Sequence, residues 1–257
     1  MLRRTIFTSL ILTIIGNVVS AAELPDISKV LVKLENVLEM SNDVKCKVTL
    51  TQQKVDQGVK VIEMIYYRRD SDDSFLIVMT APEVEKGNGY LRSGDNFWMY
   101  RRNTRTFQHV NRDESIGGSD ASADDFEKRK LTELYAGAKD ENNKELISET
   151  MLGKIPVYQL ELQAIVKDVD YPKKVYWIKK AEYLPLKETS YSLSGTLMQT
   201  AYFLKYVPID NKFVPVKQVF IDEFEKGNKT IVELSAISTK KLDSAIFTKA
   251  YLENLSK

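Results

Sequence analysis

Two hydrophobic periods alternate along this chain, and each predicts a different kind of element. Between Asp26 and Met40 apolar residues recur every three or four positions, with Lys and Glu on the other side, which indicates one amphipathic helix of about four turns. Asp26 suits the N-cap of this helix, and Ser41-Asn42-Asp43 ends it. From Val44 the period becomes two, so the chain is expected to continue as short β-strands.

The first stretch of alternating residues predicts six strands, most of them joined by short turns. Short turns make neighbours in sequence antiparallel neighbours in space, so this part of the chain is expected to form a meander. The predicted strands are Val44–Lys54, Val59–Arg69, Ser74–Met79, Gly89–Arg92, Phe97–Arg101 and Thr106–Asn111.

A second helix and a second meander follow. Ser122 suits the N-cap of a helix from Ala123 to Ala136, and the carboxylates of its first turn favour the positive end of the helix dipole. Short helices over Asp243–Phe247 and Lys249–Leu255 are expected at the end of the chain. The strands predicted between these helices are Lys144–Met151, Val157–Ala164, Lys173–Lys179, Leu184–Ser192, Thr196–Val207, Phe213–Glu223 and Lys229–Lys241.

The number of strands determines the expected architecture. An open sheet of more than about ten strands must curl or split. Curling lets one concave face collect the apolar residues, while a helix can lie across the opening. The predicted fold class is therefore α+β and mainly β: a strongly curled antiparallel sheet, an unclosed β-barrel, with helices covering the hollow.

The first 21 residues have the features of a secretory signal peptide. Arg3 and Arg4 precede an apolar run over residues 6–19, and small residues follow it at Ser20, Ala21 and Ala22. The run is short for a bilayer span, which needs about 20 residues. We expect cleavage after Ala21; a permanent N-terminal membrane anchor is the alternative. Residues 22–257 contain no Pro/Gly/Ser-rich linker and are expected to form a single domain.

Charge and cysteine content exclude several classes of function. The full chain has 37 basic and 36 acidic residues, and the predicted cleavage removes only Arg3 and Arg4, so 35 basic residues remain. A nearly neutral chain without long basic runs argues against nucleic-acid binding. The single cysteine, Cys46, excludes an intramolecular disulfide and a cysteine-based zinc site. Cys46 alternates with Val44 and Val48, which predicts a buried strand residue, and it lies too far from the predicted cleavage site to carry a lipid.

A specific order of short motifs begins at Pro82, Gly87 and Leu91. It continues with Gly94-Asp95-Asn96, Trp98, Tyr100, Gly118-Ser119-Asp120, Asp124-Asp125-Phe126, Tyr171-Pro172-Lys173, Leu184-Pro185-Leu186-Lys187, Val214-Pro215, Gly227-Asn228-Lys229-Thr230 and Phe247-Thr248-Lys249-Ala250-Tyr251-Leu252. In order and spacing this resembles the bacterial outer-membrane lipoprotein-sorting proteins, relatives of the periplasmic carrier LolA and its receptor LolB. Two positions depart from the family pattern, since Ala121 stands where an aromatic residue is usual and Arg101-Arg102 where a proline is common.

The resemblance implies a periplasmic carrier whose hollow takes up acyl chains. Its partners would be a lipid or lipidated protein, an inner-membrane transporter and an outer-membrane acceptor, with peripheral membrane contact. Burying one methylene contributes ~0.8 kcal/mol, so an acyl chain requires an enclosed apolar site rather than a surface groove. No cofactor is expected.

Apolar and aromatic residues on the predicted strands are the candidates for an acyl pocket. Trp98 and Tyr100 lie on one face of a strand, with Phe97 and Met99 on the other, and the resemblance favours the first pair. The alternative is that these side chains fill a solid core. The full candidate set is Phe75, Ile77, Met79, Leu91, Trp98, Tyr100, Tyr176 and Phe203, with Phe220 as a weaker member.

A lipid hydrolase that uses the same pocket is the competing function. It would need His109, the single histidine, with Ser115 or Ser119 as nucleophile and Asp120 or Asp113 as the orienting carboxylate. The chain has no Gly-x-Ser-x-Gly motif, and a solvent-facing strand position explains His109 as well. One histidine also excludes a histidine-rich metal site, so no metal is expected.

The basic residues around Arg101 and Arg102 form the one locally cationic region. Arg105 and Arg112 follow it, and Arg68 and Arg69 lie upstream. A solvated strand face explains these residues. The alternative is a rim at which Arg101 and Arg102 dock on anionic headgroups or an acidic partner.

Overall fold

The computed structural model describes residues 23–40, 42–94, 96–110 and 129–256. The first described half contains helix α1 (Ile27–Leu38) and a run of β-strands, with the 3-10 turn η1 (Asp70–Asp72) between β2 and β3. The strands are β1 (Val44–Lys54), β2 (Gly58–Arg69), β3 (Ser74–Ala81), β4 (Gly89–Ser93), β5 (Asn96–Arg101) and β6 (Thr106–His109).

The second half begins with the single-turn helix α2 (Leu131–Leu134) and ends with η3 (Ser244–Phe247) and α3 (Lys249–Leu255). Between them lie β7 (Tyr135–Gly137), β8 (Ile147–Leu152), β9 (Ile155–Ala164), β10 (Lys173–Lys179), β11 (Pro185–Tyr191), β12 (Leu197–Ile209), β13 (Lys212–Asp222) and β14 (Lys229–Ser238).

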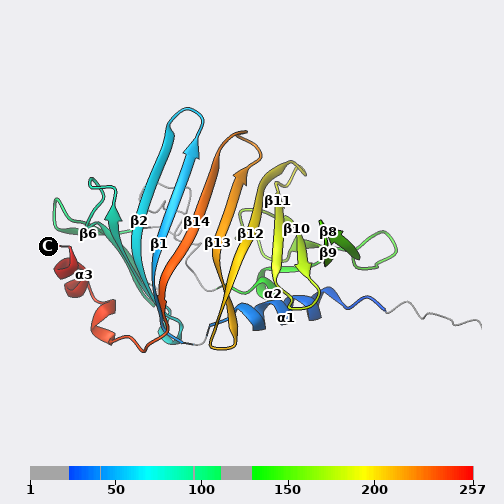
Figure 1. Cartoon of the computed structure of the whole chain (residues 1–257), viewed down its shortest axis with the longest axis horizontal. Coiled ribbons are helices and arrows are strands. Elements are labelled where there is room, and N and C mark those ends of the chain that lie inside the picture. Colours follow the sequence, from blue (N-terminus) through cyan, green and yellow to red (C-terminus); the bar gives the residue numbers. More distant parts are fainter. Residues whose placement is uncertain (1–22, 41, 95, 111–128, 257) are drawn as a thin grey trace, which may run out of the picture.

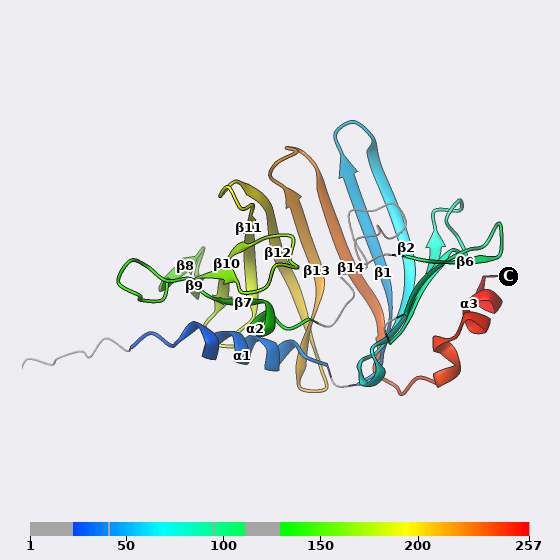
Figure 2. The same ribbon diagram turned by 180° about the vertical axis from the view of Figure 1, so that it is seen from behind.

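Within the described residues these fourteen strands form one sheet. The order is β6-β5-β4-β3-β2-β1-β14-β13-β12-β11-β10-β9-β7, with β8 also paired to β9. The sheet curls without closing, because β6 and β7 are at the two ends of the strand order (Figures 1 and 2). The predicted fold class, an unclosed antiparallel sheet with few helices, is confirmed. No described helix has the length and apolar character needed to cross a bilayer.

The predicted second helix is wrong in its C-terminal part. Residues 123–128 of that prediction lie outside the described residues, and Leu131–Leu134 forms only one helical turn. Tyr135–Gly137 is the strand β7, which pairs with Ala164, Gln163 and Leu162 of β9. The backbone of β9 offers hydrogen-bonding partners along this edge, and that tertiary pairing overrides the local helical preference.

The N-terminus of α1 is held by a residue far along the chain. Asp26 occupies the N-cap position, but its side chain makes no capping hydrogen bond and instead lies 2.7 Å from Lys29 Nζ. The Ile27 amide donates to Glu145 Oε2 at 2.6 Å. Ile27, Val30, Leu31 and Leu34 are the buried residues of this helix, so α1 contacts the sheet along one stripe.

Strand register defines two faces of the sheet, because residues directly opposite in an antiparallel pair share a face. We call the face that α1 contacts the inner face and the other the outer face. The register follows the inner face across the sheet: Leu160 pairs with Tyr176, Tyr176 with Glu188, Glu188 with Ala201, Ala201 with Phe220, Val232 with Leu50, Val48 with Met64, Met64 with Met79, Ile77 with Tyr90, and Tyr90 with Met99.

Helices cover opposite faces at opposite ends of the sheet. α1 contacts β13 and β7, whereas η3 and α3 contact β3 and β4 near the other end of the sheet (Figures 1 and 2). On the outer face Phe247 and Leu252, from the terminal helices, pack in one buried cluster with Leu76 and Leu91. β3 is consequently buried on both faces over Ser74–Met79.

Candidate functional site

The inner face carries two buried apolar clusters. We name the first the sheet cluster; it consists of Cys46, Val48, Leu50, Ile62, Met64, Tyr66, Phe75, Ile77, Met79, Tyr90 and Phe97. We name the second the helix cluster; it consists of Ile27, Val30, Leu31, Leu34, Tyr135, Tyr158, Leu160, Leu162, Tyr176 and Ile178. The sheet cluster lies on β1 to β5, and the helix cluster lies between α1 and β9 and β10.

Between these clusters the inner face of β12 to β14 remains apolar but is only half buried. Phe203, Phe220, Val232 and Leu234 form this central floor, and none of the four belongs to the buried core. Phe203 lies opposite Gln218, and Gln218 lies opposite Val232, which places these side chains on one face. The Phe203 and Tyr206 rings are stacked with centroids 6.5 Å apart. A half-exposed apolar floor on a curved sheet can accept hydrocarbon without unfolding the core around it.

A buried ion pair interrupts the apolar inner face. Lys174 Nζ lies 2.5 Å from Glu188 Oε1, and Ser190 Oγ donates to the same oxygen at 3.0 Å. The Lys174 ammonium also lies 5.7 Å from the ring centroid of Tyr135. The charge of the Glu188 carboxylate is therefore balanced by the Lys174 ammonium, and the Ser190 hydroxyl donates a further hydrogen bond to it.

The ion pair holds both side chains in their charged forms. Burial alone would raise the pKa of Glu188, but the charge and hydrogen bond of Lys174 outweigh burial and lower that pKa below its usual value. Burial opposes the charged form of Lys174 as well, yet the Glu188 charge leaves the pKa of Lys174 raised. Burial, followed by the charge of Glu188, raises the pKa of Tyr176 well above its usual value. The three groups thus form a charge-balanced pair with a neutral phenol beside it.

The structure places five of the eight predicted pocket residues on the inner face. Phe75, Ile77 and Met79 belong to the sheet cluster, and Tyr176 belongs to the helix cluster. Phe203 lies on the central floor between them. These five are close to fully buried except Phe203, so Phe203 is the member of the set with room for a ligand beside it.

The other three predicted pocket residues lie on the outer face, so the prediction that they share a face with Phe75, Ile77 and Met79 is wrong. Leu91 and Tyr100 are buried in the outer cluster with the C-terminal helix, and Trp98 packs against that cluster. The neighbouring pair, Phe97 and Met99, faces inward instead. Two-residue spacing correctly groups Trp98 with Tyr100, and strand pairing places Leu91 opposite Trp98, but spacing does not show which residues of β3 share their face.

The comparisons with known proteins agree with this geometry. A protein-family model described as "Uncharacterized protein"-like matches residues 71–254. A LolA superfamily protein from Nitrosomonas europaea is 19% identical with a TM-score of 0.70, and the match covers 89% of this chain and 100% of that one. The chain belongs to the family of the model that matches residues 71–254, and its likeness to the solved structure shows that it has the LolA fold. None of the curated proteins matches the sequence.

Two further solved structures share the LolA fold with this chain. A domain from Vibrio parahaemolyticus assigned as an outer membrane lipoprotein-sorting protein is 18% identical, with a TM-score of 0.73 and coverage of 88% of this chain and 97% of that one. A DUF1329 family protein from Desulfovibrio piger is 20% identical with the same TM-score and coverage. At these identities the likeness establishes the fold and leaves the ligand to be determined from the site.

The predicted rim arginines of this LolA-like chain, Arg101 and Arg102, are both exposed. Arg101 ends β5, and the Arg102 amide donates to Asn88 Oδ1 at 2.9 Å in the turn that follows. Arg102 and Arg105 line a small polar cavity of about 140 Å³ together with Tyr100, Glu253 and Ser256. This cavity lies against the C-terminal helix and could hold a small polar group, but not an acyl chain.

The predicted hydrolase residues are not assembled in the described part of the LolA fold. His109 is exposed on β6, where its ring lies 5.2 Å from that of Trp98 on the outer face. Ser115, Ser119, Asp113 and Asp120 lie outside the described residues. In the described residues no three His, Cys, Asp or Glu side chains gather as they would around a metal ion.

Sequence reasoning overlooked the inner-face residues Val232 and Leu234, and on β5 it favoured Trp98 and Tyr100 over the inward-facing pair of Phe97 and Met99. Val232 and Leu234 on β14 and Phe97 on β5 contact the sheet cluster or belong to it. Alternation along β14 is a usable signal for the first two, because Ile231 and Val232 point to opposite faces of one strand. Only the pairing of β14 with β1 decides which of the two faces inward.

Proposed function

We propose that this protein is a periplasmic carrier that binds the acyl chain of a lipid or lipoprotein on the inner face of its sheet and transports it to the outer membrane. The observation that carries the proposal is the half-buried apolar floor of Phe203, Phe220, Val232 and Leu234 between two buried clusters. Such a floor leaves apolar surface partly accessible at the centre of an unclosed sheet, where hydrocarbon would complete its burial.

The energetics favour an acyl chain over a small polar ligand. Each methylene transferred from water contributes ~0.8 kcal/mol, so a chain of about fourteen carbons represents on the order of 10 kcal/mol as an upper bound. A carrier must also release its cargo. An unclosed sheet assists release because the binding face can be reached without breaking strand pairs, which a closed barrel would require.

Purification without detergent, followed by organic extraction and mass spectrometry, tests the proposal. We expect a lipid or a lipidated peptide to be extracted with the folded protein and to be displaced by a fluorescent fatty acid. Absence of extracted lipid together with no uptake of the fluorescent fatty acid would indicate a protein that does not bind acyl chains.

The same preparation separates a carrier from a lipid hydrolase. A carrier leaves an added phospholipid intact, whereas a hydrolase that uses His109 releases fatty acid and loses that activity in His109→Ala. The proposal extends to an inner-membrane transporter that loads the carrier and an outer-membrane acceptor that unloads it. Export with cleavage after Ala21 is part of the same proposal, and the intact mass of the exported protein tests it.

A further inference from the structure

Four neighbouring hairpin connections on one edge of the sheet project exposed apolar side chains. They join β1 to β2, β13 to β14, β11 to β12 and β9 to β10, which are consecutive in the sheet order. The first three project to the same side in both ribbon views (Figures 1 and 2). The exposed side chains are Val55, Val59, Phe224, Leu193, Ile165 and Val166, and we call this set the apolar rim.

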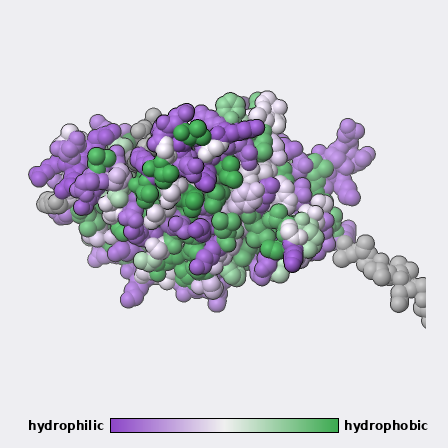
Figure 3. Space-filling view, turned by 45° about the horizontal axis from the view of Figure 1, so that its top comes forward, coloured by the Kyte–Doolittle hydropathy of each residue, from purple (hydrophilic) through white to green (hydrophobic). Residues whose placement is uncertain are grey.

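The exposure of the apolar rim is unusually large for side chains of this size. Leu193 is 91% exposed, and Val55 and Phe224 are each 67% exposed. On the opposite edge, the turns at residues 70–73 and 210–211 consist of Asp, Ser and Asn. In the space-filling view with the top of the molecule brought forward, hydrophobic residues are interspersed with hydrophilic ones (Figure 3). Large apolar side chains that project from successive turns on one edge indicate a contact surface.

Several polar groups of the β13–β14 and β11–β12 turns have hydrogen-bond partners within the protein. The Asp222 carboxylate accepts hydrogen bonds from the Phe224 and Glu225 amides at 2.9 and 2.7 Å. In the β11–β12 turn the Thr196 amide donates to Ser192 Oγ at 3.1 Å. Because these groups already have partners, the turn tips can leave water for a less polar medium at little cost in lost hydrogen bonds.

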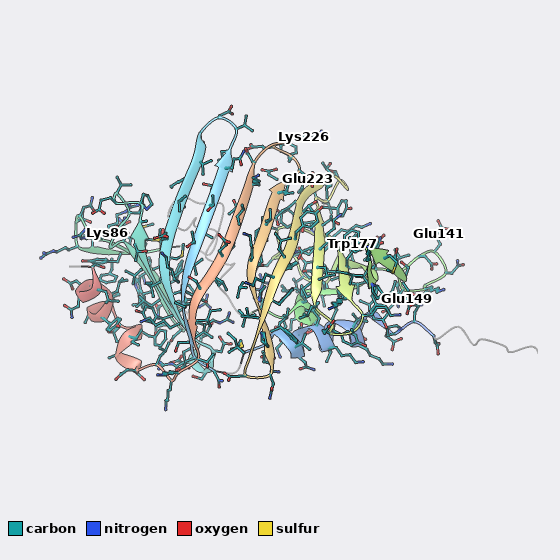
Figure 4. All side chains as sticks on the ribbon, viewed as in Figure 1. Lys86, Glu141, Glu149, Trp177, Glu223 and Lys226 are labelled. Carbon is teal, nitrogen blue, oxygen red and sulfur yellow. The ribbon has the colours of Figure 1, made fainter. Side chains whose placement is uncertain are left out.

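Both acids and lysines lie beside the apolar rim. Glu225 Oε2 accepts from Asn228 Nδ2 at 2.8 Å, and Asp168 Oδ2 lies 3.6 Å from Arg129 Nη2, so two rim acids are engaged within the protein. Lys226 and Lys167 are exposed, and among the described residues neither lysine has an acidic partner. Lys226 and Glu223 mark the β13–β14 tip at the top edge in Figure 4. Lysines next to inserted apolar side chains can extend to the phosphates.

We propose that the apolar rim docks this protein on a phospholipid bilayer, with Leu193, Phe224 and Val55 entering the interface between headgroups and acyl chains. Six side chains on four separate turns present no single groove for a helix or strand of a protein partner, whereas a fluid bilayer admits each tip independently. This docking adds a membrane contact to the proposed carrier, and it is tested with substitutions at the rim that leave the inner face unchanged.

Vesicle flotation with phosphatidylethanolamine and phosphatidylglycerol measures the docking directly. The full chain is expressed in bacteria for every variant, and each protein is used with whatever N-terminus it has after purification. We expect Leu193→Ser with Phe224→Ser to lower the vesicle affinity by about tenfold or more, because two apolar anchors are lost.

Met151→Ser is the matched control, since Met151 is 57% exposed on β8, away from the rim. Figure 4 shows Glu149 of the same strand far from Lys226. Equal losses in both variants, or no loss in the rim variant, would overturn the proposal.

A fluorescent label provides a second readout that does not depend on removing apolar residues. Cys46 is 3% exposed, so an environment-sensitive thiol label added to the folded Leu193→Cys variant reacts at the new cysteine. We expect its emission to shift to the blue on addition of vesicles, while the label on Met151→Cys does not shift. An unshifted label at Leu193→Cys would overturn the docking. We expect the rim variants to take up fluorescent fatty acid in vesicle-free solution as the parent does. This measurement distinguishes a failure of membrane docking from a failure of the proposed acyl binding.

Discussion

Phe97 and Trp98 are consecutive residues of β5, and they belong to apolar clusters on opposite faces of the sheet. The Phe97 ring lies 5.6 Å from that of Phe75 on the inner face. Lys249 Nζ, from α3, lies 4.2 Å from the centroid of the Trp98 ring on the outer face. One strand therefore connects the candidate binding face to the packing of the C-terminal helix.

This division predicts different consequences for two adjacent substitutions. Phe97→Ala removes a buried ring and should lower the free energy of unfolding by about 3–5 kcal/mol. Trp98→Ala should instead weaken the docking of α3, which appears as faster amide hydrogen exchange over residues 243–256. Exchange over these residues that is faster in Phe97→Ala than in Trp98→Ala would contradict the assignment of faces.

The buried pair of Lys174 and Glu188 predicts a strongly non-additive double-mutant cycle. Glu188→Gln leaves the Lys174 ammonium without its carboxylate and should cost about 3–5 kcal/mol of stability. Lys174→Met with Glu188→Gln removes both charges and should cost less than the sum of Lys174→Met alone and Glu188→Gln alone. Denaturant titrations of all four proteins give the coupling energy, and additive costs would show that the pair does not interact.

The same pair predicts a direction for the acid dependence of stability. The folded-state pKa of Glu188 is lowered, so its contribution is present above the unfolded pKa and is lost as the pH falls through the folded pKa. The stability difference between the parent and Glu188→Gln should therefore shrink on acidification. A difference that is constant from neutral to acidic pH would mean that the Glu188 carboxyl is not preferentially ionised in the folded protein.

The thiol of Cys46 should be unreactive in the folded protein. Burial raises the pKa of Cys46 to about 11, so the thiol stays protonated at neutral pH. As the pH rises above the usual thiol value near 9.0, the unfolded chain ionises before the folded one, and stability should fall. A thiol reagent should modify Cys46 at the rate of unfolding. Modification of folded protein at the rate of a free thiol would contradict its burial.

Glu145 should contribute more to the stability of α1 than Asp26 does, although Asp26 occupies the N-cap position. The carboxylate of Glu145 accepts the hydrogen bond from the Ile27 amide, whereas Asp26 makes no such bond. Glu145→Ala should cost about 1 kcal/mol, in the range of a lost helix cap, and should increase hydrogen exchange at the start of α1. Asp26→Ala serves as the control and should have the smaller effect.

Much of the sheet follows from alternation along the sequence. The predicted bounds Val44–Lys54, Lys173–Lys179 and Lys249–Leu255 are those of β1, β10 and α3. These segments have one polar and one apolar side, so period alone identifies them. β7 could not be predicted this way, because Tyr135–Gly137 becomes a strand only through its hydrogen bonds to β9.

The assignment of faces depends on information that the strands do not carry locally. β3 is buried on both faces over six successive residues, so its hydrophobicity does not distinguish inner from outer positions. The connection from residue 82 to 88 is also too long to fix the register between β3 and β4 by turn type. The pairing of Ile77 with Tyr90, rather than with Leu91, decides that Leu91, Trp98 and Tyr100 face outward.

The measurement that tests the proposed acyl binding most directly compares two neighbouring residues of β14. Val232 lies on the central floor of the inner face and Ile231 on the outer face, and both are half buried. We expect Val232→Trp to fill space at the floor and lower the affinity for a fluorescent fatty acid by about tenfold, while Ile231→Trp binds as the parent does. Equal affinities for Val232→Trp and the parent, with both variants folded, would show that the inner face does not hold the acyl chain.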